Sequence, residues 1–281
     1  MTVTKFRYRD DPGADEVDFY RAHGYLYVEN FYDRATEIEP ILKDIHELIS
    51  LLCESHAIPL QRGPYSAEKF DEGLPFLIQN HRAVVGVLYD AVKKLPNYVR
   101  LACAEKNDRY ARAILRSSFV GFANRGYGIR MDNPNEDQYS TQLHQDYVSQ
   151  LCSQNATVLW SPLREVGAAL GPMTIYPGSH ASGVFPITKT SEGSRGLVIK
   201  GERELAKRPR ISPDVGVGDC IFLDFLTLHE SGQNRSNRTR WAMLSRYFDF
   251  TDASGRAIGW KGGLQEGTLF ENIHPELVQN S

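Results

Sequence analysis

Three residues of this chain have the types and spacing of a metal site. His144 and Asp146 lie in the segment Gln-Leu-His-Gln-Asp, and His229 ends an apolar run that follows a Gly-Asp turn. On a β-strand, residues two apart point to the same face, so an imidazole and a carboxylate could converge there, with His229 as a third ligand. Taken alone, the His-x-Asp pair is better explained by two surface residues at a strand end. With His229 it forms the facial triad that non-haem Fe(II) oxygenases favour, although zinc accepts the same ligands.

Arg240 and Ser231 extend this pattern toward an α-keto acid. Arg240 follows His229 by eleven residues, and Ser231 follows it by two. An α-keto acid that chelates a metal through its keto and adjacent carboxylate oxygens needs a partner for its far carboxylate. Arginine offers a planar, permanently protonated fork for that carboxylate, and a hydroxyl adds one more donor. Arg240 could instead be one of several cations on a solvated hairpin, but its place after His229 favours the clamp.

The elements that must position these residues change in character near residue 116. Before it, helical periodicity dominates, and after it, short strands rich in Val, Ile, Phe and Tyr alternate with turn residues. We expect a single α+β domain over 1–281, with a mainly helical cover (1–116), a β-sandwich or barrel core (117–250) and a C-terminal tail (251–281). Helices are predicted at 15–22, 35–54, 84–94 and 98–115. Strands are predicted at 25–29, 117–123, 140–146, 156–162, 171–176, 219–228 and 240–250.

Composition restricts the classes of partner. The 281 residues carry 32 Lys and Arg against 35 Asp and Glu, for a net charge of −3. This balance argues against a surface built for nucleic acid or anionic membranes. No apolar run approaches the length of a membrane span, and the first ten residues lack an apolar signal core. The four cysteines are far apart, as in a protein with reduced thiols, so we expect a cytoplasmic protein.

The chain resembles the phytanoyl-CoA dioxygenase family from about residue 14 to 250. The resemblance rests on His144-Gln-Asp146, on the segment Gly-Pro-Met-Thr-Ile-Tyr-Pro-Gly-Ser-His at 171–180, and on His229-Glu-Ser231 with Arg240. Phe-Tyr at 19–20, His-Gly-Tyr at 23–25 and the Gly-Asp turn at 218–219 also match the family pattern. The resemblance implies a double-stranded β-helix, or jelly roll, with the N-terminal helices packed on one face. It also implies Fe(II), 2-oxoglutarate and O2.

The resemblance assigns roles residue by residue. His144, Asp146 and His229 would bind iron, and Arg240 and Ser231 would hold the distal carboxylate of 2-oxoglutarate. Two further residues are candidates for contact with the cosubstrate, Trp160 and Gln142. Trp160 is an aromatic residue that could equally pack in the core, and Gln142 shares the strand parity of His144. Because related halogenases lack the carboxylate that Asp146 supplies, hydroxylation is the expected reaction. Desaturation, ring closure and epoxidation stay open.

The substrate is less well defined. Residues in segments around the His-x-Asp motif and on the last strand are candidates for its pocket, namely Arg130, Asp132, Tyr147, Gln150 and Arg246. The long polar connection at 181–213 is a candidate lid. These polar residues favour a small polar metabolite or a natural-product intermediate, with no nucleic acid or membrane partner. The sequence does not indicate an oligomeric state.

Two alternatives come from other classes. A non-redox, cupin-like isomerase or hydrolase could use the same triad, although it has no use for a carboxylate clamp. A catalytically silent binding protein would be expected to have a broken triad, and here the triad is complete. The mild acidity and the lack of basic and aromatic stripes argue against an oxidative nucleic-acid demethylase.

Overall fold

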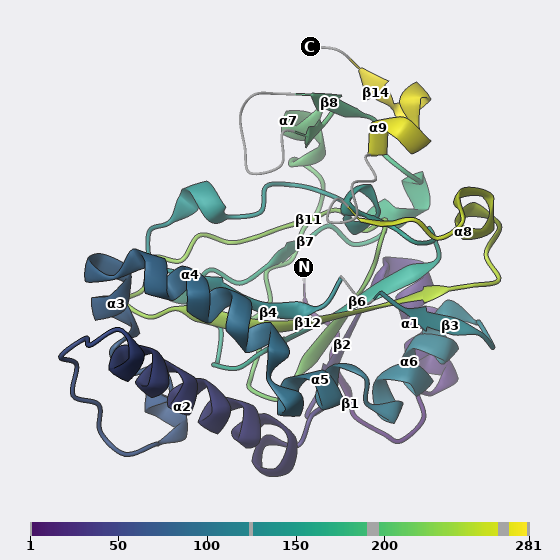
Figure 1. The fold of residues 1–281 in the computed structure, drawn as a ribbon. Coiled ribbons are helices and arrows are strands. Elements are labelled where there is room, and N and C mark those ends of the chain that lie inside the picture. Colours follow the sequence, from purple (N-terminus) through teal and green to yellow (C-terminus); the bar gives the residue numbers. More distant parts are fainter. Residues whose placement is uncertain (1, 124–125, 190–196, 264–269, 280–281) are drawn as a thin grey trace.

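A large mixed sheet forms the centre of the protein in the computed structural model, which describes residues 2–123, 126–189, 197–263 and 270–279. Its strand order is β1-β2-β10-β6-β12-β3, and β4 also pairs with β12 (Figure 1). In chain order the strands are β1 (Phe6–Arg7), β2 (Tyr25–Glu29), β3 (Val120–Phe122), β4 (Gly128–Asp132), β6 (Ala156–Pro162), β10 (Cys220–Asp224) and β12 (Arg240–Asp249). The predicted strand at 156–162 is therefore confirmed to the residue.

A second, smaller sheet supplies the other side of the jelly roll. Strands β11 (His229–Glu230) and β7 (Thr174–Ile175) pair antiparallel, with His229 opposite Ile175. Single bridges extend this sheet on both sides, from His229 to His144 and from Ile175 to Ile211. The predicted metal ligands His144 and His229 are thus neighbours across a strand pair.

Helices from the first 116 residues cover the large sheet, as predicted. They are α1 (Ala14–His23), α2 (Glu39–Ser55), α3 (Leu74–Asn80), α4 (Arg82–Ala91), α5 (Pro96–Ala102) and α6 (Glu105–Leu115), with a π-helical turn, Arg34–Ile38, before α2. Figure 1 shows α2 to α5 side by side along one side of the sheet. Their apolar faces share one buried cluster with the sheet, which includes Ile41, Ile45, Leu88, Tyr110, Phe222 and Trp241.

Four sequence-based predictions of secondary structure need correction. The helix predicted at 98–115 is two helices, because the chain leaves helical geometry at Cys103 and Ala104 between α5 and α6. The helix α3 was not predicted, and neither was the strand β4. The strand predicted at 140–146 is reduced to the bridge at His144, and a 3-10 helix, Asp146–Ser149, follows at once. The buried side chain of Gln145 donates to the carbonyl oxygens of Gly183 and Leu226. These side-chain hydrogen bonds, and not the backbone hydrogen bonds of a β-sheet, hold this segment in place.

The candidate lid and the C-terminal tail contain regular structure. Strands β8 (Ile187–Lys189) and β9 (Leu197–Ile199) and helix α7 (Glu202–Leu205) lie between 181 and 213, and residues 190–196 are outside the described part. The tail contributes α8 (Ala253–Ile258), β13 (Gly262–Gly263), α9 (Phe270–Ile273) and β14 (Val278–Gln279). Strand β14 pairs with β8, and β13 pairs with β5 (Gln150–Leu151). No helix in the described ranges is both long enough and apolar enough to cross a membrane.

Candidate metal centre

His144, Asp146 and His229 converge between the two sheets. The Nε2 atoms of His144 and His229 each lie 3.9 Å from an oxygen of Asp146, and the two imidazole centroids are 4.1 Å apart. One ligand atom from each of the three residues lies within 4.8 Å of the others. Within the described ranges, this is the one group of three or more His, Cys, Asp or Glu side chains that could hold a metal ion.

Backbone carbonyl groups set the orientation of both imidazoles. His144 Nδ1 lies 2.9 Å from the carbonyl oxygen of Gln142 and 3.0 Å from that of His229, and His229 Nδ1 lies 2.9 Å from that of Thr227. Carbonyl oxygens only accept hydrogen bonds, so each Nδ1 must carry the proton. This leaves the Nε2 atom of each ring facing the cluster, and in the neutral ring Nε2 is the nitrogen with a lone pair for a metal ion.

A cation supports the carboxylate of the cluster. Arg246 donates from one nitrogen to Asp146 Oδ1 at 3.0 Å and from another to the carbonyl oxygen of Gly126 at 2.5 Å. Asp146 is only 1% exposed, so this ion pair lies in a largely water-free environment. The sequence predicted Arg246 as a residue of the substrate pocket. In the structure it lines the metal pocket and contacts Asp146, a candidate metal ligand.

Arg240 lies at the start of β12 and is buried. Its guanidinium group faces Asp132 of β4, with nitrogen–oxygen distances of 3.0 and 3.2 Å, and it donates to the carbonyl oxygens of Gly171 and Gly232. Arg130 binds the other oxygen of the same carboxylate at 2.7 Å. Asp132 therefore bridges two arginines, and the three side chains together carry one net positive charge.

The structure brings most of the predicted site residues into one pocket. Ser231 and Trp160 line the metal pocket together with Arg130, Asp132, Arg240 and Arg246. The side chain of Gln142 is exposed, because the chain at 140–146 is not a continuous strand and the expected parity does not hold. Tyr147 is fully buried against α9, where its hydroxyl pairs with His274, and burial raises the pKa of Tyr147 to about 12. Gln150 lies in β5 and, like Gln142 and Tyr147, is not part of the pocket lining.

Several lining residues had not been predicted. Thr141 accepts a hydrogen bond from Arg130, and Leu244 lies between Arg240 and Arg246 on the inward face of β12. Strand parity could have identified Leu244, because it is even-numbered like both arginines. Nothing in the local sequence marks Thr141, whose position depends on how the chain packs beyond β4.

Comparison with known proteins identifies related chains. A family model described as "Phytanoyl-CoA dioxygenase (PhyH)" matches residues 20–242. A curated relative, "Phytanoyl-CoA dioxygenase, peroxisomal" from Bos taurus, is 29% identical over 140 residues, which is 48% of this chain. That match spans only 39% of the bovine protein.

Solved structures share the fold at low identity. The epimerase SnoN in complex with Fe3+, alpha ketoglutarate and nogalamycin RO is 19% identical with a TM-score of 0.56, and the similarity covers 87% of each chain. EctD from S. alaskensis with 2-oxoglutarate and 5-hydroxyectoine is 17% identical with a TM-score of 0.54, over 86% of this chain and 77% of EctD. These similarities establish the jelly-roll fold for this chain.

Proposed function

The chain belongs to the phytanoyl-CoA dioxygenase family, and from this premise we propose that it is an Fe(II)- and 2-oxoglutarate-dependent dioxygenase. We further propose that it hydroxylates a C–H bond of a small polar metabolite or natural-product intermediate, with release of succinate and CO2. The observation that carries the proposal is the convergence of His144, Asp146 and His229 in a pocket that also contains Arg240. A cytoplasmic location remains a prediction from the sequence.

The donor set fits iron. Two neutral imidazoles and one carboxylate form the facial triad of non-haem Fe(II) enzymes, and such a triad leaves other coordination positions open. When bound together, Fe(II) and 2-oxoglutarate supply the oxidising power by reducing O2 while 2-oxoglutarate is decarboxylated. His144, Asp146 and His229 would hold the metal, and Arg246 would keep the carboxylate of Asp146 in place.

The neighbouring charges fit the distal carboxylate of 2-oxoglutarate. Arg130 and Arg240 share the single carboxylate of Asp132, which leaves one positive charge to balance an incoming anion. Arg240 would bind that anion as a fork, with the Ser231 hydroxyl as a further donor from the same pocket. Trp160, 7% exposed on β6, would contact the cosubstrate with its ring.

Relatives and residues together support hydroxylation as the reaction. The EctD structure contains the hydroxylated molecule 5-hydroxyectoine, whereas SnoN is described as an epimerase, so the fold accommodates more than one kind of ligand and outcome. Asp146 occupies the position at which related halogenases lack a carboxylate, which favours hydroxylation over halogenation. The side chains that orient the substrate decide between hydroxylation and the other outcomes.

One observation favours a second candidate, a non-redox metalloenzyme of the isomerase or hydrolase class. The guanidinium group of Arg240 is already paired with Asp132 and with backbone carbonyl groups, as expected if it were purely structural. In that case the triad would bind a metal, and 2-oxoglutarate would have no site.

An anaerobic optical titration separates these candidates. Metal-free protein receives Fe(II) and then 2-oxoglutarate, and a visible charge-transfer band is expected on the second addition. Arg240→Ala should raise the 2-oxoglutarate concentration for half-saturation at least tenfold. The matched variant Asp132→Asn removes the competing negative charge and keeps an oxygen acceptor, so it should bind 2-oxoglutarate at least as tightly as the wild type.

Three other results would each contradict part of the proposal. Iron binding without a band would indicate the non-redox metalloenzyme. A band that Arg240→Ala leaves unchanged would exclude Arg240 as the clamp, and failure to bind iron would exclude the proposed triad.

A further inference from the structure

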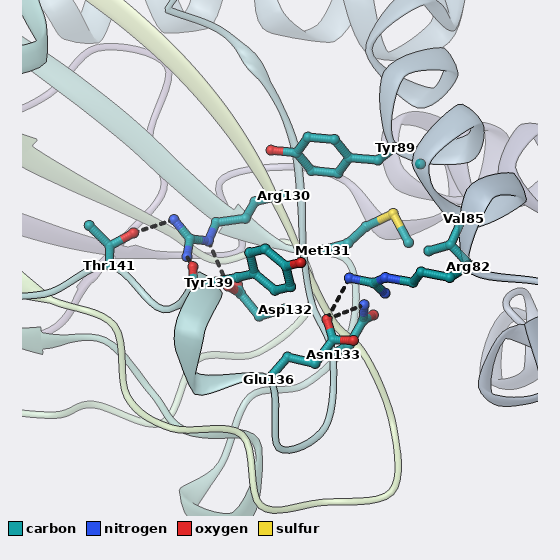
Figure 2. Close-up of a pocket in the computed structure, with 11 residues that line it drawn as sticks. Arg82, Val85, Tyr89, Arg130, Met131, Asp132, Asn133, Glu136, Tyr139 and Thr141 are labelled. Atoms are coloured by element: carbon teal, nitrogen blue, oxygen red, sulfur yellow. Dashed lines mark hydrogen bonds and ion pairs between the residues drawn. The ribbon is translucent and has the colours of Figure 1, made fainter. Parts of the chain in front are cut away.

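A cavity of about 480 Å³ opens between helix α4 and strand β4 (Figure 2). This volume falls in the range of sites for drug-sized ligands. We propose that this cavity, called here the outer chamber, binds the substrate, and that the substrate is an uncharged, flat polycyclic molecule with hydroxyl or carbonyl groups. The inference rests on the proposed function and names the substrate class of the same site.

The outer chamber adjoins the metal pocket. Arg130, Asp132 and Thr141 line both, so one wall separates the chamber from the residues around His144 and Asp146. The metal pocket has a volume of only about 60 Å³. A drug-sized substrate does not fit there beside a metal and a cosubstrate, whereas the adjoining chamber can hold its body next to the side chains that the two spaces share.

The charges of the outer chamber are internally balanced. Arg82 forms an ion pair with Glu136 at 2.9 Å, and Arg130 forms one with Asp132 at 2.7 Å. These four side chains are the charged residues of its lining, so the lining has no net charge. A substrate with several phosphate groups, such as a coenzyme A thioester, would find no spare cation here. An uncharged molecule can bind without breaking either ion pair.

The uncharged part of the lining suits a flat apolar body. Tyr89 and Tyr139 are 40% and 57% exposed, and Met131 and Val85 add apolar surface (Figure 2). A cation lies over one face of each ring, Lys93 over Tyr89 and Arg82 over Tyr139, so a ligand would stack on the opposite faces. The two tyrosine hydroxyl groups provide hydrogen-bonding partners for oxygen substituents, whereas the amide of Asn133 is buried and already bonded to Glu136 and Thr239.

Gly86 controls the size of the outer chamber. It lies in the middle of α4 and in the chamber lining, and a Cβ atom added there would meet nothing within 4 Å. Glycine inside a helix is destabilising relative to alanine, so the residue is unfavourable for the helix. Its effect is to leave open space on the side of α4 that faces the chamber.

Gly86→Phe tests the inference, because it fills the outer chamber from a helix position that accepts side chains. The matched control is Val87→Phe, one residue further along α4, where the side chain is 47% exposed and outside the lining. Each protein is loaded with Fe(II) and 2-oxoglutarate under anaerobic conditions. The binding of estradiol, a neutral polycycle with two hydroxyl groups, is then measured by calorimetry, with palmitoyl-coenzyme A as the polyanionic probe.

We expect estradiol to bind the wild type and Val87→Phe within twofold of each other, and Gly86→Phe at least tenfold more weakly. The charge-transfer band should be the same in all three proteins, because the metal pocket is unchanged, and this also shows that the variants are folded. Gly86→Ala, which adds one methyl group, should have an intermediate effect.

Three results would overturn the inference. They are no binding of estradiol to the wild type, equal binding of estradiol to the wild type and Gly86→Phe, and binding of palmitoyl-coenzyme A to the wild type that Gly86→Phe weakens. Failure of the proposed function is distinguishable from these. In that case the wild type would show no charge-transfer band, whether or not estradiol binding depends on residue 86.

Discussion

At the scale of single residues, the metal site depends on groups that do not themselves face the metal. The Nδ1 atoms of His144 and His229 are engaged by backbone carbonyl groups, and this leaves Nε2 as the ligand atom of each ring. Asp146 has its own support in Arg246. Such supporting contacts orient metal ligands and influence affinity almost as strongly as the ligands do.

Arg246→Ala should weaken metal binding. The substitution removes the hydrogen bond that holds Asp146 Oδ1, so the buried carboxylate can rotate away from the imidazoles. We expect the affinity for Co(II), a redox-stable probe of the site, to fall about 10- to 100-fold. Calorimetry on the metal-free protein measures it, with Arg256→Ala, an exposed arginine on α8, as the control. A higher affinity of Arg246→Ala for Co(II) would show that repulsion between Arg246 and the metal ion outweighs the benefit of its hydrogen bond to Asp146.

At the scale of elements, β12 connects the site to the helical cover. Its even-numbered residues Arg240 and Arg246 face the metal pocket. Its odd-numbered residues Trp241 and Tyr247 pack into the cluster shared with the helices, where Tyr247 donates to the carbonyl oxygen of Ala102 at 2.9 Å. The alternation of a single strand thus serves both the site and the core.

Asp71 links β12 to the segment between α2 and α3, and Asp71→Ala should be strongly destabilising. Its carboxylate accepts from Trp241 Nε1 at 2.9 Å and pairs with Arg164 at 2.6 Å, and all three side chains are buried. Removing it leaves a buried guanidinium without this partner, at a cost of about 3–5 kcal/mol. Urea unfolding measures the change in free energy of unfolding. The control Asp90→Ala removes a mostly exposed partner of Lys93 and should change stability by about 0.5 kcal/mol or less.

Asp224, at the end of β10, should make stability depend on pH. Burial raises the pKa of Asp224 to about 6, and the hydrogen bond from the Leu226 backbone and the nearby charges of His180 and Arg21 offset this only in part. The folded state therefore binds more protons than the unfolded state between about pH 4 and pH 6, and stability falls as the pH rises through that range.

Asp224→Asn keeps the acceptor for Leu226 and cannot ionise. Relative to wild type, its stability should therefore increase by about 1–3 kcal/mol between pH 4 and pH 7. Urea unfolding at both pH values gives the difference, and Asp214→Asn, at an exposed position, should show no such change. Parallel pH profiles for wild type and Asp224→Asn would contradict the assignment.

At the scale of the whole molecule, the helical cover and the large sheet form one structural unit. A single buried cluster contains Ile41 of α2, Leu88 of α4, Phe222 of β10 and Trp241 of β12. Helices that bury their apolar faces against the sheet gain most of their stability from that contact.

Unfolding should accordingly be one cooperative transition. Circular dichroism, which reports mainly on the helices, and tryptophan fluorescence, to which Trp160 and Trp241 of the sheet contribute, should give coincident urea curves. Co(II) at a hundred times its Kd should stabilise the protein by about 2.7 kcal/mol, and His144→Ala should abolish this shift. Two separate transitions would show that the cover and the jelly roll are independent.

The three candidate metal ligands, the division into helical and strand regions and the family could all be predicted from the sequence. Each depends on local information, namely residue types, short spacings and the periodicity of apolar positions. The strand at 156–162 was predicted to the residue, and β12 to within one, because buried strands have strong local patterns.

Only the tertiary structure decided which side chains reach the pocket. Gln142 is excluded because its segment does not continue as a strand, and Arg246 reaches Asp146 from a hundred residues away. Asp132 meets Arg240 because β4, absent from the prediction, pairs with β12 in that register. The outer chamber exists because α4 lies against β4. Such contacts depend on strand register and on the packing of segments far apart in the chain, which local residue preferences do not encode.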